Sequence, residues 1–115
     1  MIVDDEKSVR LLLTDVLEGP GRKVACFENP LVALEHIHQN PVDIAFLDLM
    51  MPGMTGVELA KHLKQLHPRA RVVICTGYLA ENVATLSGLT NVDHVVPKPF
   101  DLATILELAA LEDAK

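Results

Sequence analysis

The chain has 115 residues, the length of one ordinary domain, and a formal net charge of −6, which argues against nucleic-acid binding by this domain alone. No apolar run approaches the roughly 18 residues of a membrane span, and the first residues lack the basic flank and apolar stretch of a signal peptide. We therefore expect residues 1–115 to form a single cytoplasmic domain without membrane contact. Cys26 and Cys75 have no metal-binding or redox spacing, so we expect both to be reduced and buried.

Short apolar runs alternate with amphipathic segments from the start of the chain. The first run, residues 1–3, is shorter than the ~5–6 residues usual for a strand, so either residues precede it or the first strand is a stub. A helix is predicted over residues 9–17, where apolar side chains recur three and four positions apart, and Gly-Pro-Gly at 19–21 ends it. A second strand is expected over residues 23–26.

The middle of the chain repeats this alternation. Asn29 is expected to cap the second helix, with Pro30 at its first position. A third strand is predicted over residues 44–48, and a third helix from about residue 56 to residue 68. The pattern predicts that three residues of the second helix face the core: Leu31, Leu34 and Ile37.

Two further strands complete the pattern, over residues 71–75 and 94–96, with a short fourth helix over residues 80–86 between them. Asp101 is expected to cap a last helix whose apolar stripe consists of Leu102, Ile105, Leu106 and Ala109. Five strands alternating with helices predict an α/β fold, a doubly wound (βα)5 unit in which helices cover both faces of a parallel sheet.

Polar side chains stand at the carboxyl ends of four of these strands. In an open parallel sheet that edge is where ligands bind, so we expect the side chains to converge there. The five residues are Asp4 and Asp5 after the first strand, Asp48 at the end of the third, Thr76 after the fourth and Lys98 after the fifth.

This set of residue types indicates phosphoryl transfer to an aspartate. Three neighbouring carboxylates repel one another unless a cation neutralises them, and an all-oxygen site suits Mg²⁺. A carboxylate nucleophile beside a divalent metal, a lysine and a hydroxyl can accept a phosphoryl group. In-line attack by Asp48 would leave an acyl phosphate, and Thr76 would hydrogen-bond one of its oxygens.

Each residue taken alone also has a purely structural interpretation. Asp4 and Asp5 could cap the first helix, Asp48 could cap a turn, and Lys98 could be a solvated lysine. Their joint occurrence at strand ends favours a site over these separate explanations.

Four motifs, in order, carry a family resemblance. Residues 2–6 read Ile-Val-Asp-Asp-Glu, residues 48–56 fit the pattern Asp-x-x-Met-Pro-x-x-x-Gly, Thr76 is followed by Gly77, and residues 98–100 read Lys-Pro-Phe. On these motifs, essentially the whole chain resembles the receiver domains of two-component response regulators. The resemblance implies a flavodoxin-like five-stranded parallel sheet with strand order 2-1-3-4-5.

The resemblance also implies a role for each site residue. Asp48 would be phosphorylated, and Thr76 would be the switch hydroxyl. Lys98 would pair first with Asp48 and then with the phosphoryl group. Mg²⁺ would be the cofactor, held directly by Asp5 and Asp48, through water by Asp4, and by the backbone carbonyl of Met50. The bond between Lys98 and Pro99 is expected to be cis.

The implied partners are a histidine kinase or histidine phosphotransfer protein as donor, and a downstream protein or output domain that the sequence does not identify. We expect no separate enzymatic turnover. The fourth helix contains no Lys or Arg, so a dimer held by charged pairs of that helix is not expected. Val95 stands where receivers commonly carry an aromatic residue, so the response is expected to pass through residues 77–86.

Three other functions are weighed against this one. An aspartyl-phosphate phosphatase typically needs a second acid two residues after the nucleophile, where this chain has Met50. A flavin-binding electron carrier would need a phosphate-cradling loop after the first strand, where this chain has Asp4, Asp5 and Glu6. A degenerate receiver used only for protein contact would not be expected to retain every site residue.

Overall fold

The computed structural model describes residues 1–19, 22–77, 91–98 and 101–113. Five parallel strands form one sheet in the order β2-β1-β3-β4-β5, which confirms the predicted strand order. The strands are β1 (Ile2–Val3), β2 (Cys26–Phe27), β3 (Ile44–Asp48), β4 (Arg71–Thr76) and β5 (His94–Pro97).

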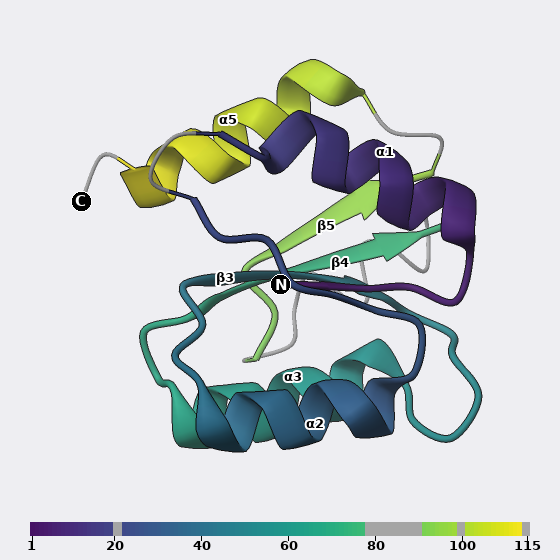
Figure 1. The fold of residues 1–115 in the computed structure, drawn as a ribbon, viewed down its shortest axis with the longest axis vertical. Helices are drawn as coiled ribbons and strands as arrows, with labels where there is room; N and C mark the ends of the chain where they lie inside the picture. Colours follow the sequence, from purple (N-terminus) through teal and green to yellow (C-terminus); the bar gives the residue numbers. More distant parts are fainter. Residues whose placement is uncertain (20–21, 78–90, 99–100, 114–115) are drawn as a thin grey trace.

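Helices cover both faces of this sheet, as expected for a doubly wound fold (Figure 1). α1 (Lys7–Leu17) and α5 (Leu102–Asp113) lie on one face. α2 (Pro30–Gln39) and α3 (Gly56–Leu66) lie side by side on the other. The fourth helix expected over residues 80–86 lies outside the described residues. Among the helices that are described, none is long and apolar enough to cross a membrane.

Alternate residues of each strand supply two separate cores. Ile2, Phe46 and Val73 belong to the cluster beneath α1 and α5. Val3, Leu47 and Ile74, each the next residue along its strand, belong to the cluster beneath α2 and α3. Because successive side chains of a strand point to opposite faces, strands that read as continuous apolar runs can fill both layers.

Side-chain caps define the N-termini of α2 and α3, the two helices on one face of the sheet. The Asn29 side chain accepts a hydrogen bond from the backbone N–H of Leu31 at 2.8 Å and caps α2, as predicted. Thr55 and Glu58 form a reciprocal capping box at the start of α3, with Thr55 Oγ1 accepting from the backbone N–H of Glu58 at 3.1 Å. The box sets where α3 begins, directly after the loop that follows Asp48.

Some sequence-based details were wrong. The second strand is shorter and later than predicted, because it pairs with the two-residue β1, and Cys26 at its start is exposed rather than buried. Several residues expected to face the core are instead 42–51 % exposed: Leu31 on α2, and Leu102 and Leu106 on α5. Pro30, Ala33 and Leu108 on the same helices are buried instead, whereas Ile37, Ile105 and Ala109 are buried as predicted.

Candidate functional site

The sheet register brings the predicted site residues to one edge. Val3 pairs with Leu47, so the next residue on each chain segment, Asp4 and Asp48, lie side by side. Asp48 itself pairs with Cys75, which places Thr76 one position beyond it on β4. Thr76 pairs with Pro97, and Lys98 follows directly. The convergence expected from strand ends is therefore present.

The three acids form a compact oxygen cluster. One carboxylate oxygen from each of Asp4, Asp5 and Asp48 lies within 4.8 Å of the others. Asp4 is 1 % exposed and Asp48 is 8 % exposed, whereas Asp5 faces solvent. Three carboxylates and no nitrogen or sulfur ligand form a donor set that fits a hard divalent cation such as Mg²⁺.

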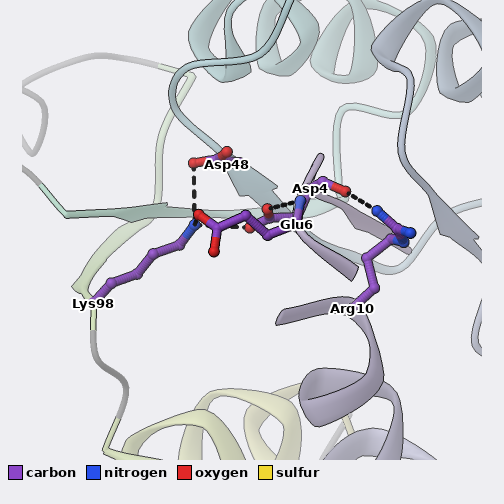
Figure 2. A network of polar contacts seen from close by, with 5 residues as sticks. All are labelled: Asp4, Glu6, Arg10, Asp48 and Lys98. Atoms are coloured by element: carbon purple, nitrogen blue, oxygen red, sulfur yellow. Dashed lines mark hydrogen bonds and ion pairs between the residues drawn. The ribbon is translucent and has the colours of Figure 1, made fainter. Parts of the chain in front are cut away.

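Lys98 lies between two of these acids (Figure 2). Its Nζ donates to Asp4 Oδ2 at 2.9 Å and to Asp48 Oδ1 at 3.3 Å. Its backbone N–H donates to the carbonyl oxygen of Thr76 at 2.7 Å, which ties β5 to β4 at the site. The Lys98 side chain is only 16 % exposed, so the alternative interpretation of a solvated lysine is wrong.

Asp4 is engaged on every polar atom that it offers. Its Oδ1 accepts from the backbone N–H of Glu6 at 2.9 Å, and its own N–H donates to the carbonyl of Phe27 at 3.1 Å. Its backbone carbonyl accepts from Arg10 Nη1 at 2.8 Å. The residue at the helix N-cap position is Glu6, which makes no side-chain cap. Asp4 therefore braces the turn before α1 while its other carboxylate oxygen contacts Lys98.

Burial and like charge act together on Asp48. Burial, followed by the negative charge of Asp4, raises the pKa of Asp48 to about 6, although Lys98 opposes the shift. Burial alone would lower the pKa of Lys98, but its contacts with Asp4 and then Asp48 outweigh that effect and raise it. Lys98 is therefore a permanent cation at neutral pH, and the Asp48 carboxylate beside it holds a proton more tightly than usual.

Three predicted site residues remain, and the structure describes two of them, Thr76 and Met50. Thr76 is 2 % exposed. Met50 lies in the loop two residues after Asp48, and its side chain is 56 % exposed; the role of its carbonyl oxygen as a metal ligand stays a prediction. Pro99 lies outside the described residues, and the expected cis bond stays a prediction. Sequence reasoning missed Arg10, whose only signal was a cation six positions after Asp4 on the first helix.

Comparisons with known proteins give a consistent result. A family model described as the response regulator receiver domain matches residues 1–110. The DNA-binding transcriptional regulator NtrC of Escherichia coli K12 is 36 % identical over 101 residues, which cover 88 % of this chain and 22 % of that protein. The sporulation initiation phosphotransferase F of Bacillus subtilis is 33 % identical over 109 residues, which cover 91 % of this chain and 85 % of that protein.

Solved structures share the fold. The receiver domain of AraT, a response regulator from Geobacillus stearothermophilus, superposes with a TM-score of 0.84 at 29 % identity, covering 98 % of this chain and 90 % of that one. The BeF3-activated DrrB receiver domain superposes with a TM-score of 0.86 at 24 % identity, covering 99 % and 95 % of the two chains, and this likeness concerns the fold alone. The present chain spans only 22 % of the length of the NtrC regulators that it matches.

Proposed function

The chain belongs to the family of response regulator receiver domains, whose model spans residues 1–110, and we propose that Asp48 is the residue that accepts the phosphoryl group in this member. The observation that carries the proposal is the contact of Lys98 Nζ with Asp48 Oδ1 at 3.3 Å, inside a cluster of three carboxylates. A lysine and an acidic metal-binding cluster beside one nearly buried carboxylate are the groups that phosphoryl transfer to aspartate requires.

In the proposed reaction, a carboxylate oxygen of Asp48 attacks the phosphorus of a phosphohistidine in line with the leaving nitrogen. The new O–P bond forms as the P–N bond breaks, which leaves an acyl phosphate on Asp48 and returns the electron pair to the imidazole of the donor. Lys98 is already held at the site by Asp4, so it can move from Asp48 to the phosphoryl oxygens over a short distance.

The acidic cluster would hold Mg²⁺, which receiver domains generally bind at such a position. Asp5 and Asp48 would be direct ligands, the carbonyl of Met50 would be another, and Asp4 would act through water. When bound, the metal would offset negative charge on the transferred oxygens. Thr76 would donate its hydroxyl to one of those oxygens, and the response would continue into residues 77–86, which lie outside the described residues.

Partners follow from the same proposal. A histidine kinase or a histidine phosphotransfer protein would donate the phosphoryl group, and a downstream protein or output domain would read the phosphorylated state. We propose that the domain works in the cytoplasm and turns over no separate substrate. The absence of a dimer held by charged fourth-helix pairs stays a prediction, because that helix lies outside the described residues.

Labelling with a small phosphodonor tests the proposal. The protein is incubated with Mg²⁺ and acetyl phosphate, and its intact mass is measured. The wild type should gain one phosphoryl group, and Asp48→Asn should gain none. Asp15→Asn, which changes an exposed acid on α1, is the matched control and should be labelled like the wild type. Equal labelling of Asp48→Asn would contradict the assignment.

A further inference from the structure

Arg10 reaches the acidic site from the side opposite Lys98 (Figure 2). Its Nη1 donates to the backbone carbonyl oxygen of Asp4 at 2.8 Å, and its Nη2 lies 3.9 Å from Glu28 Oε2. The Arg10 side chain is 18 % exposed, whereas that of Glu28 is 76 % exposed. The contact with Asp4 is therefore the better defined of the two, and the pair with Glu28 is a weak surface interaction.

The carbonyl that Arg10 binds belongs to the peptide unit joining Asp4 to Asp5. Because a peptide unit is planar, fixing this carbonyl fixes the direction in which the chain enters Asp5. Asp4 does not depend on Arg10 alone, since its carboxylate is held by the backbone of Glu6 and by Lys98. Asp5 is exposed, so the orientation of this peptide matters more for Asp5 than for Asp4.

Charge and position predict opposite effects of Arg10 on metal binding. A fixed cation near three carboxylates repels a second cation and would weaken its binding. A group that orients a ligand strengthens binding, because less ordering remains to be done when the metal arrives. Because the Arg10 side chain is only 18 % exposed, solvent screens this repulsion incompletely, so the two effects compete and a measurement of metal affinity distinguishes them.

We propose that Arg10 is a positioning residue for the metal site: by holding the Asp4 carbonyl, it orients Asp5 and tightens the binding of a divalent cation despite its own positive charge. The inference rests on the proposed function, in which the acidic cluster holds Mg²⁺. It adds a residue of α1 that lies outside the ligand set and acts through the backbone of the turn that follows β1.

The test is a titration with MgCl₂ at constant ionic strength, in which the amide chemical shifts of residues around Asp5 and Asp48 report metal binding. Arg10→Gln should bind Mg²⁺ about tenfold more weakly than the wild type, at the low end of the effects of groups that orient metal ligands. Equal or tighter binding by Arg10→Gln would overturn the proposal and leave repulsion as the only role of the charge.

Three variants separate position from charge. Lys7→Gln removes an exposed charge from the same helix and should bind Mg²⁺ at least as tightly as the wild type. Glu28→Gln removes the weak ion pair but keeps the contact with Asp4, and should leave binding unchanged. Arg10→Lys keeps the charge and one donor, so it should recover part of the affinity. Equal weakening in all of these variants would also overturn the proposal.

Two further measurements keep the result unambiguous. Thermal unfolding without metal, followed by circular dichroism, checks that each variant folds; if Arg10→Gln does not fold, weaker binding by Arg10→Lys than by the wild type supports the proposal, and equal binding overturns it. Asp5→Asn tests the proposed metal site itself. If Asp5→Asn binds Mg²⁺ normally, the proposed function fails, whereas normal binding by Arg10→Gln alone refutes only the role of Arg10.

Discussion

Gly56 lies so close to Asp48 that a Cβ atom at position 56 would overlap the backbone carbonyl oxygen of Asp48. The first residue of α3 therefore packs directly against the backbone of the proposed acceptor. The N–H of Gly56 also donates to the carbonyl of Leu49 at 2.9 Å, which closes the loop between β3 and α3. Glycine is required at position 56 because the backbone of Asp48 leaves no room there for a side chain.

Replacing this glycine should disturb both the fold and the site. Gly56→Ala should lower the free energy of unfolding by about 1–3 kcal/mol, because the obstructing atom belongs to the backbone and cannot rotate away. It should also slow labelling of Asp48 by acetyl phosphate. Urea denaturation measures the first effect. Gly19→Ala is the control, since nothing lies within 4 Å of a Cβ at Gly19, and equal losses in the two variants would contradict this explanation.

Lys98 should stabilise the metal-free protein by compensating two acids. Lys98→Met removes both hydrogen bonds and should lower the free energy of unfolding by about 1–3 kcal/mol without metal. Saturating Mg²⁺ should reduce this loss, because the metal supplies the missing positive charge. Thermal melts with and without MgCl₂ make the comparison.

The control for Lys98 is the other well-formed lysine pair of the described residues. Lys64 Nζ donates to Asp93 Oδ2 at 2.8 Å, away from the acidic cluster. Lys64→Met should therefore lose stability by an amount that Mg²⁺ does not change. If the loss of stability in Lys98→Met is likewise independent of Mg²⁺, Lys98 and the metal do not neutralise the same carboxylates.

The raised pKa of Asp48 predicts a pH dependence with a definite sign. The pKa is about 6 in the folded state against a usual 3.8, so between these values the folded state binds the proton more tightly than the unfolded state. This group therefore stabilises the metal-free protein as the pH falls through 6, and the stabilisation is lost as the pH rises through 6.

Asp48→Asn isolates this effect because an amide mimics the protonated acid. Without metal, Asp48→Asn should be more stable than the wild type at about pH 7.5, and the difference should narrow at about pH 4.5. Urea denaturation at the two pH values gives the difference. Asp15→Asn, which changes an exposed acid on α1, is the control. A stability difference for Asp48→Asn that stays constant with pH would show that folding does not raise the pKa of Asp48.

Asp4 and Asp5 should have separable roles. Asp5 is exposed, so Asp5→Asn should weaken Mg²⁺ binding more than Asp4→Asn does, and it should stabilise the metal-free fold by relieving repulsion. Asp4 is 1 % exposed and bonded to Glu6 and Lys98, so Asp4→Asn should instead destabilise the metal-free fold. Mg²⁺ titration and thermal melts together test this. Equal, unimpaired metal binding by both variants would contradict the carboxylate site.

The strand order and the convergence of the acids and Lys98 could be predicted from the sequence, because each apolar run shows where a strand ends and which polar residue follows it. Asp4, Asp48 and Lys98 each follow an apolar run, and parallel strands bring such ends to one edge. The helix faces were less predictable. Leu31 and Leu106 continue apolar patterns, yet both side chains are about half exposed. Periodicity identifies the apolar side of a helix, but it does not show how much of that side the sheet and the neighbouring helices cover.

Two other features depend on tertiary geometry that residue types do not encode. The limits of β2 follow from its pairing with β1, where Ile2 pairs with Cys26 and Val3 with Phe27. Arg10 contacts a backbone carbonyl, and every residue has one, so the residue type at position 4 does not indicate the contact.

Direct chemical identification of the phosphorylated residue tests the central claim most sharply. An acyl phosphate is reduced by borohydride to an alcohol, which converts a phosphorylated aspartate into homoserine. After incubation with Mg²⁺ and acetyl phosphate, reduction and proteolysis, mass spectrometry of the peptide that contains residues 44–48 should locate homoserine at position 48 alone. Homoserine at Asp4 or Asp5, with Asp48 unmodified, would contradict the account.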